Sequence, residues 1–306
     1  MTASLPEVAA RLFDPARLCV DAGKAAAIVT ALGPRILATP EVVVIGAEAV
    51  DHVAFQNGRP SAGRLTDWTG RRLDAQGVAA FDRVGPVAVI PIEGTLVHKG
   101  SYVGKSSGKT SYEGLQAQIT RAGKDPSVKG VVFEVDSYGG EVSGMFDTAD
   151  LMARLSVEKP TMAILTDNAL SAGYALASAA RTIVMPEHGA AGSIGAISLH
   201  ADFSRQLENS GVRVSVLRAG ARKADANPYE ALSHEAAGSI LQDLERIRAS
   251  FANLVARHRL GRFSAKQSLM TEGAAFDGRD ALAMRMVDAV GHPSEAFDLF
   301  VRSMGR

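Results

Sequence analysis

A serine among small residues is the main candidate for a nucleophile in this sequence. Ser171 opens the stretch Ser171-Ala172-Gly173-Tyr174, shortly after the apolar run 161–165. At the start of a helix, the helix dipole favours negative charge that develops near this hydroxyl, and small neighbours let a substrate approach closely. A serine in such a place more often caps the helix with its hydroxyl. A reactive hydroxyl and a capping hydroxyl are therefore competing predictions for Ser171.

A serine hydroxyl is a weak nucleophile unless a base takes its proton. Lys223 lies 52 residues after Ser171, and His188 and His200 lie 17 and 29 residues after it. A lysine is usually a solvated surface charge, and as a base it would need its pKa lowered from ~10.4 toward ~7 to 8 by burial and a positive neighbour such as Arg222. The residue pattern leaves both a lysine base and a histidine base open.

Two further segments could stabilise negative charge or support the site. Adjacent Gly139 and Gly140 follow a strand-like run, and their amides could bind an oxyanion, although paired glycines more often form only a turn. The loop around Ser193 approximates the nucleophile elbow of hydrolases, but Ala191 replaces its leading glycine. We therefore expect Ser193 to support the residues of the site without reacting with the substrate itself. A phosphate-loop pattern at 104–110 has its first glycine one residue too close and is set aside.

The elements around these residues predict an α/β fold. Apolar runs rich in β-branched residues indicate strands at 87–92, 131–135, 161–165, 182–185 and 212–217. Between them, apolar residues recur at helical spacing in 112–119 and 145–155. Right-handed crossovers would make the sheet mostly parallel and bring the strand ends near Val135 and Leu165 to one edge, where sites usually lie.

The predicted organisation has three parts. Residues 1–80 form an N-terminal arm or cap, 81–295 form the main domain, and 296–306 form a short tail. Within the main domain, a long amphipathic helix spans about 234–255, with Ser233 as its N-cap.

Composition narrows the class of protein. The chain has 306 residues with 46% hydrophobic residues, and its 33 basic and 33 acidic residues cancel, so we expect a globular protein with no nucleic-acid partner. The single cysteine, Cys19, argues against a disulfide framework and multi-cysteine metal sites. Polar residues interrupt the apolar stretch 160–180, which we predict as strand, turn and helix instead of a membrane span. The N-terminus lacks the pattern of a secretory signal, so a cytoplasmic location is expected.

Four ordered segments resemble peptidase family S49, which contains signal peptide peptidase A and the phage capsid-assembly (prohead) proteases. They are 136–142, 171–174, 192–195 and 219–223. The likeness extends over about 84–291, and segments 94–100 and 111–114 look closer to the phage branch. It implies a ClpP/crotonase-like fold and a serine–lysine dyad without a cofactor or metal. Carried over by motif, Ser171 is the nucleophile, Lys223 the base, and Gly139 or Gly140 with Ala172 the oxyanion hole.

The resemblance also implies assembly and a biological role. Members of the family form rings, in some of which the lysine comes from the neighbouring subunit, so we expect a homo-oligomer. The expected function is a prohead protease that cleaves phage scaffold or capsid proteins, in the cytoplasm or within a prohead. Tyr138 stands where the family usually has a proline, which could relax the glycine loop. Alternatives are a cytoplasmic protease like signal peptide peptidase, a histidine-dependent serine protease, an acyl-CoA enzyme of the crotonase type, and a non-catalytic assembly protein.

Overall fold

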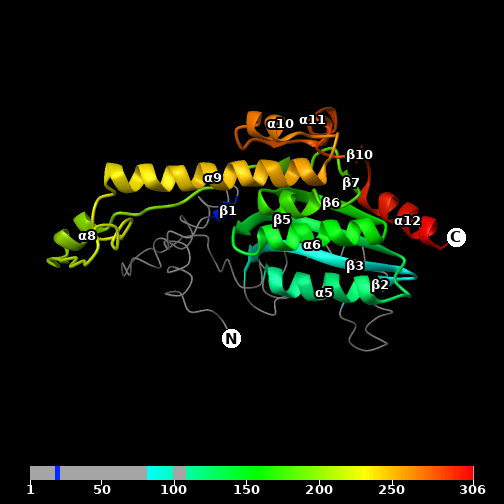
Figure 1. Cartoon of the computed structure of the whole chain (residues 1–306), viewed down its shortest axis with the longest axis horizontal. Coiled ribbons are helices and arrows are strands. Elements are labelled where there is room, and N and C mark those ends of the chain that lie inside the picture. Colours follow the sequence, from blue (N-terminus) through cyan, green and yellow to red (C-terminus); the bar gives the residue numbers. More distant parts are fainter. Residues whose placement is uncertain (1–17, 21–80, 99–107, 306) are drawn as a thin grey trace, which may run out of the picture.

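A computed structural model describes residues 18–20, 81–98 and 108–305 (Figure 1). The strands are β1 (Leu18–Val20), β2 (Asp82–Val84), β3 (Val87–Val97), β4 (Lys109–Ser111), β5 (Gly130–Glu141), β6 (Thr161–Leu170), β7 (Thr182–Met185), β8 (Ala190–Gly192), β9 (Ala275–Phe276) and β10 (Ala289–Val290). The helices are α5 (Tyr112–Lys124), α6 (Met145–Glu158), α7 (Ala172–Ala177), α8 (Ser204–Asn209), α9 (His234–His258), α10 (Ala265–Met270), α11 (Gly278–Ala283) and α12 (Pro293–Met304). Apart from β1, the predicted arm 1–80 lies outside the described residues, and so does most of the phosphate-loop pattern.

The described strands form one mixed sheet whose central path runs β10-β7-β6-β5-β3-β2. Along this path all neighbours from β3 to β10 are parallel, and β2 is antiparallel to β3. Four of the five predicted strands are confirmed, as β3, β5, β6 and β7. The predicted α/β class with a mostly parallel sheet is therefore confirmed.

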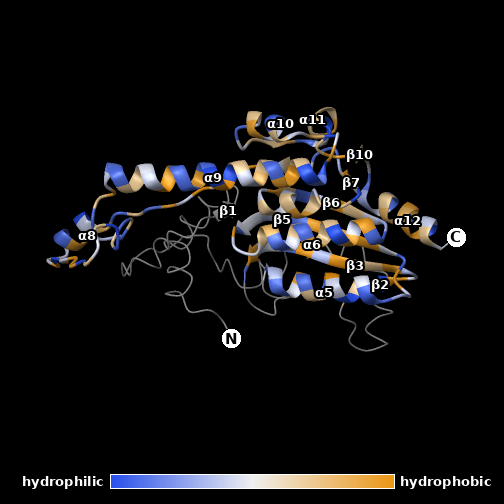
Figure 2. Cartoon of the chain, viewed as in Figure 1, coloured by the Kyte–Doolittle hydropathy of each residue, from blue (hydrophilic) through white to orange (hydrophobic). Residues whose placement is uncertain are grey.

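Alternating side chains on the central strands feed two apolar layers, because successive residues of a strand point to opposite faces. In β5, Val131, Phe133 and Val135 belong to the larger core, which the helices α5, α6, α7 and the C-terminal half of α9 cover. Val132 of the same strand faces the smaller core beneath α12. Both faces are buried, as parallel sheets require. Figure 2 shows the result, with apolar colours along β3 and mixed colours on α5 and α6.

Residues near the C-terminus belong to the sheet packing. Helix α12 starts with Pro293 in its first turn, where a missing N–H costs nothing. Its Phe297 and Phe300 are buried against the sheet. The boundary predicted at residue 296 falls inside this helix.

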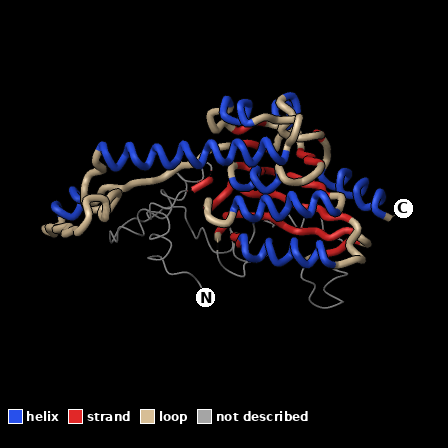
Figure 3. Tube along the Cα trace, in the orientation of Figure 1, coloured by secondary structure: helices blue, strands red, loops and turns tan. Residues whose placement is uncertain are grey.

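The crossovers place the ends of β5 and β6 at one edge. The two strands pair in parallel from Val131↔Thr161 to Val135↔Leu165, and after a register shift Ser137 lies opposite Ala169. Beyond Ala169, β6 no longer pairs with β5. Its last residue, Leu170, pairs with Gly192 of β8, and α7 begins after Ser171. Helices α5 and α6 run along the strands in front of the sheet (Figure 3).

One segment stands apart from this body, and we call it the projecting arm (residues 195–235). Figure 1 shows α8 and the N-terminal end of α9 extending to the left, away from the sheet. No residue between 195 and 235 is buried. The strand predicted at 212–217 is wrong, because these residues are irregular and mostly exposed and pair with no strand in the part of the chain that the structure describes. The predicted long helix is confirmed as α9, and the Ser233 side chain accepts a hydrogen bond from the backbone N–H of Ala236.

Candidate active site

Ser171 occupies a sharp turn between β6 and α7. Its backbone has φ 53° and ψ −120°, a conformation that non-glycine residues rarely adopt. Its N–H donates to the carbonyl oxygen of Gly192 at 2.7 Å, and its own carbonyl accepts from Ala175 at 3.0 Å, so the turn is held from both sides. Residues held in such conformations cost about 1–3 kcal/mol each and cluster at functional sites. This strand, strained serine and helix have the arrangement of a nucleophile elbow.

The side chain of Ser171 does not cap α7. Ser171 is 1% exposed, and its hydroxyl forms no hydrogen bond with the described residues. A capping serine would bond a backbone N–H of the first turn. The capping prediction for Ser171 is therefore wrong, and the hydroxyl is available for another partner.

Small residues let α7 approach β5 closely. A Cβ on Gly173 would lie 2.8 Å from the carbonyl oxygen of Ser137, and one on Gly140 would lie 1.9 Å from that of Leu96. Neither contact is compatible with a side chain, so glycine is required at both positions. Gly139 has φ +98°, which again favours glycine. The Gly173 contact packs α7 against β5 two residues before the glycine pair, and the Gly140 contact packs β5 against β3.

The two glycine amides have different partners. The N–H of Gly139 donates to Ser137 Oγ at 3.1 Å, and that hydroxyl in turn donates to the carbonyl of Gly94 at 2.7 Å. The side chain of Asn168 donates to the hydroxyl of Tyr138 at 3.3 Å, which connects this loop to β6. A local network therefore fixes the loop that contains Tyr138.

Ser193 directly follows the residue to which the Ser171 turn is hydrogen-bonded. Its preceding residue, Gly192, accepts the Ser171 N–H, and Ser193 itself has φ 56° and is 8% exposed. Its N–H donates to the carbonyl of Ala274 at 2.8 Å. This loop connects the Ser171 turn to β9 and gives the predicted supporting position a backbone basis.

The structure does not bring Lys223 to Ser171 within one chain. Lys223 is exposed and lies in the projecting arm, whereas Ser171 is buried at the sheet edge. The arm extends away from the body in Figure 1. Within a single copy of the described chain, the predicted nucleophile Ser171 therefore lies apart from the predicted base Lys223.

Neither predicted histidine base reaches Ser171. His200 Nε2 lies 3.0 Å from the carbonyl oxygen of Asn227, inside the projecting arm. No hydrogen bond joins His188 or His200 to the serine among the described residues. Among the described residues, the histidine-dependent alternative therefore has no geometric support.

A serine, histidine and aspartate do form a chain at the other end of α7. Ser178 Oγ lies 3.1 Å from His258 Nδ1, and His258 Nε2 lies 3.2 Å from Asp150 Oδ1. Ser178 is fully buried, and its hydroxyl donates to the carbonyl of Ala175 at 2.7 Å. A hydroxyl that is buried and hydrogen-bonded in this way cannot contact a substrate. The contacts among Ser178, His258 and Asp150 therefore connect α6, α7 and α9 and have a structural role.

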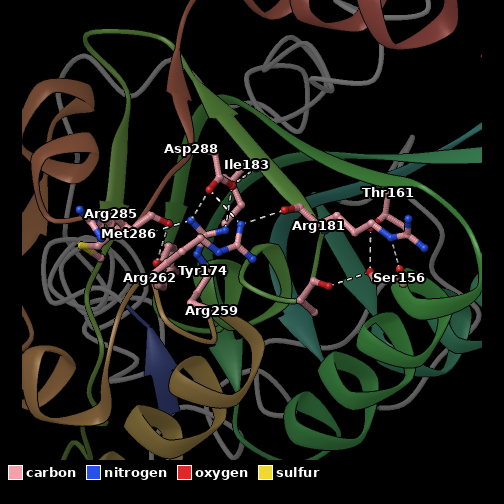
Figure 4. Close-up of polar contacts among 11 residues, drawn as sticks. Ser156, Thr161, Tyr174, Arg181, Ile183, Arg259, Arg262, Arg285, Met286 and Asp288 are labelled. Carbon is pink, nitrogen blue, oxygen red and sulfur yellow. Dashed lines mark hydrogen bonds and ion pairs between the residues drawn. The ribbon is translucent and has the colours of Figure 1, made fainter. Parts of the chain in front are cut away.

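Beside it, a buried ion pair anchors the C-terminal segment (Figure 4). The Arg259 side chain is fully buried and its two terminal nitrogens each donate to Asp288 at 2.8 Å. Arg262 and the N–H of Ile183 also donate to this carboxylate, at 2.9 and 2.8 Å. Burial alone would raise the pKa of Asp288, but the hydrogen bonds and charge of Arg259 hold it below the ordinary value.

Tyr174 ties α7 to the same region. Its hydroxyl donates to the carbonyl of Met286 at 2.9 Å, and burial raises its pKa far above the usual range. The sequence analysis missed Arg259, Asp288 and Tyr174 as a group. Nothing in their spacing marks them, because Arg259 and Asp288 are 29 residues apart and meet only through the fold.

Comparison with known proteins identifies the family of this chain. Residues 153–301 match the sequence profile of peptidase family S49. The chain carries a family S49 peptidase domain. It is 34% identical to the head-tail preconnector protein GP5 of Enterobacteria phage P21, over 72% of this chain and 44% of that protein. It is 33% identical to the capsid assembly protease C of Escherichia phage lambda, over 71% of this chain and 49% of that protein.

The chain spans about half the length of these phage relatives. Among solved structures, a stomatin-homologue-specific membrane protease from Pyrococcus horikoshii matches 71% of this chain and 78% of its own, with 15% identity and a TM-score of 0.41. In the described part of this S49 chain, no helix is long and apolar enough to cross a membrane. Nor do the described residues contain a group of three or more histidine, cysteine or acidic side chains suited to a metal ion.

Proposed function

We propose that this chain is a serine endopeptidase with Ser171 as its nucleophile. The observation that carries the proposal is the buried hydroxyl, without a hydrogen bond to any described residue, on a strained turn at the start of α7. The S49 profile match supports the reaction class.

Two amides near Ser171 would hold the oxyanion. Ala172 is the first residue of α7, so its N–H has no partner inside the helix. Of the two glycines, Gly140 is favoured, because the Gly139 N–H already donates to Ser137. Donors fixed in this way stabilise the negative charge that develops in the transition state without reorganising.

The base would be Lys223 of a neighbouring copy. Three features of the projecting arm support this: it carries Lys223, it has no buried residue, and it exposes apolar side chains. Those side chains are Val212 at 47%, Val214 at 41%, Leu217 at 95%, Tyr229 at 46% and Leu232 at 36% exposed. A soluble segment of this kind is typical of an interface. Docking on the next copy would bury the apolar residues and bring Lys223 toward a second Ser171.

The chemistry then follows the general scheme for an activated serine. Neutral Lys223 takes the Ser171 proton as the oxygen attacks the peptide carbonyl, and the amides hold the oxyanion. The protonated lysine gives that proton to the leaving amine, which releases the C-terminal product and leaves an acyl-enzyme. Water, deprotonated by the same lysine, hydrolyses the ester and restores the serine.

The substrate would be a phage scaffold or capsid protein. The relative from phage lambda is named a capsid assembly protease, and the relative from phage P21 a head-tail preconnector protein. The two relatives are longer than the region that this chain matches. Their names support a role in prohead maturation for proteins of that longer kind.

Labelling and mixing experiments test the dyad. Wild type, Ser171→Ala and Lys223→Ala are each treated with a peptidyl fluorophosphonate and assayed on casein, with Lys266→Ala as a control for loss of an exposed lysine. We expect labelling and cleavage by wild type and Lys266→Ala, none by Ser171→Ala, and at least ~100-fold less by Lys223→Ala. Co-expression of Ser171→Ala with Lys223→Ala in equal amounts should restore roughly a quarter of the sites, because each site then draws one residue from each of two neighbours.

The outcomes separate the parts of the proposal. Wild type that assembles but neither labels nor cleaves casein or a scaffold protein would contradict the peptidase assignment. An active wild type with an inactive mixture would place Lys223 in the same chain as its serine. Full activity in Lys223→Ala would assign the base to another residue.

A further inference from the structure

A three-residue strand from the N-terminal region pairs with the strand that carries the glycine pair. β1 is antiparallel to β5, with Leu18 opposite Glu141, Cys19 opposite Gly140 and Val20 opposite Gly139. We propose that β1 occupies the strand position in which a peptide substrate binds, so that the chain's own residues 18–20 compete with substrate. This inference rests on the proposed peptidase function and adds its substrate edge and an occupant for it.

The pairing partners define which edge of β5 carries β1. On one edge, β3 pairs with the same residues, Thr95 with Gly139 and Leu96 with Gly140. A strand has only two hydrogen-bonding edges, so β1 must lie on the other. That other edge is the one that β6 occupies as far as Ala169, opposite Ser137.

β1 therefore lies on the edge of β5 that β6 no longer occupies beyond Ala169. Strand β6 ends at Leu170, and the chain turns at Ser171 into α7. Among the described strands, only β1 pairs with this edge of β5 beyond Ser137, close to where the Ser171 turn begins. The backbone groups of this edge could pair with any extended peptide in place of β1.

An extended peptide binds such an edge by main-chain hydrogen bonds. The direction of β1 suits a substrate, because the chain runs from the residue opposite Glu141 to the residue opposite Gly139, that is, toward the glycine pair. A peptide in this register would bring its backbone carbonyls to the region of the proposed oxyanion donors. Main-chain pairing discriminates little between side chains, so the same edge would accept an unfolded or extended protein segment of varied sequence.

The placement is tested first without catalysis. Hydrogen exchange is followed by mass spectrometry in the full-length Ser171→Ala chain, which cannot cut itself. The comparison adds the triple change Leu18→Pro, Cys19→Pro and Val20→Pro, which removes every N–H of β1. We expect peptides covering 139–141 to exchange about tenfold faster in the proline variant. The matched change of the same three residues to alanine keeps the backbone donors and should leave exchange close to the parent.

Competition is tested in chains that retain Ser171. The proline variant should react with the peptidyl fluorophosphonate about tenfold faster than wild type, because the reagent no longer competes with β1. A synthetic peptide of residues 12–26 should slow labelling of the proline variant and of wild type, and a scrambled peptide should not. The wild-type arm keeps the test valid if three prolines destabilise the chain.

The results distinguish this inference from the function on which it rests. Faster exchange at 139–141 with no labelling in any chain would support the placement of β1 and contradict the peptidase. Unchanged exchange, equal labelling rates and no effect of the peptide in a chain that does label would overturn the inference and leave the peptidase intact.

Discussion

Helix α7 carries a buried serine at each end, and the fold treats the two hydroxyls differently. Ser178 at the C-terminal end donates to Ala175 and contacts His258, which continues to Asp150. Ser171 at the N-terminal end has a strained backbone and a hydroxyl without a partner among the described residues. The same residue type is thus a structural connector at one end of a six-residue helix and a candidate nucleophile at the other.

The contrast explains how a short helix can hold a strained residue. α7 is too short to be stable alone. The helix is fixed by the contacts of Ser178 with His258, by the hydrogen bond from Tyr174 to Met286, and by packing against α9. The Arg259–Asp288 pair locks the segment that contains Met286 to the end of α9. The anchors at Ser178 and Tyr174, together with the backbone hydrogen bonds of Ser171, therefore support the strained turn.

The largest effect should come from breaking the buried ion pair. Arg259→Ala leaves the partly buried Asp288 without its two-pronged partner, and loss of one member of a buried pair costs about 3–5 kcal/mol. Urea unfolding at pH 7 measures the loss. Fluorophosphonate labelling of Ser171 in the still-folded fraction should slow as well, because the anchored end of α7 loosens.

Arg262→Ala is the matched control for this prediction. Arg262 contacts the same carboxylate at 2.9 Å, but its side chain is 36% exposed. Exposed pairs contribute about 0–1 kcal/mol, so this variant should unfold close to wild type. Equal losses in the two variants would show that burial of Arg259 is not what makes the anchor strong.

A smaller effect is expected at Ser178. Ser178→Ala removes the partner of His258 Nδ1 inside the protein, which should lower the free energy of unfolding by about 1–3 kcal/mol. Its labelling rate at Ser171 should stay within about threefold of wild type, because the change lies at the far end of α7. Ser171→Ala should do the reverse, with no labelling and almost unchanged stability, since its hydroxyl forms no hydrogen bond with the described residues.

These two variants would contradict the assignment of the two serines if their effects on labelling and stability were exchanged. A Ser178→Ala chain that folds normally but cannot be labelled would make Ser178 part of the catalytic machinery. A Ser171→Ala chain that loses several kcal/mol would make Ser171 a structural cap.

The sequence predicted the body of the fold because local pattern and tertiary environment agree there. The runs in β3, β5, β6 and β7 are buried on both faces, and strong apolar runs are typical of such strands. The run 212–217 has equally strong β propensity but lies in the projecting arm, where none of the described strands pairs with it. Propensity without a neighbour does not make a strand.

The candidate site was predictable only in part. The residue types around Ser171 indicated a helix start, and the structure places Ser171 there. Whether its hydroxyl capped the helix depended on a backbone φ of 53°, which packing of Gly173 and Gly192 imposes and no short motif encodes. The position of Lys223 relative to Ser171 depends on the path of the arm, so spacing along the chain could not define it.

The smallest expected effect is a pH dependence at His258, which connects the C-terminal end of α7 to Asp150. Burial lowers the pKa of His258; the hydrogen bond and charge of Asp150 raise it, and Arg257 lowers it further, with a net decrease. The folded protein therefore binds this proton less readily than the unfolded chain, whose histidine pKa is ~6.5. Stability from this group is full above that value and falls as the pH drops through it.

Urea unfolding between pH 7.5 and pH 5.5 measures the effect. We expect wild type to lose up to about 1 kcal/mol from this group over that range. His258→Gln, which cannot titrate, should show a flatter profile by that amount. A wild type that gains stability from His258 as the pH falls would mean that attraction by Asp150 outweighs burial. The connector end of α7 would then tighten in acid, which is the opposite of the behaviour that its burial predicts.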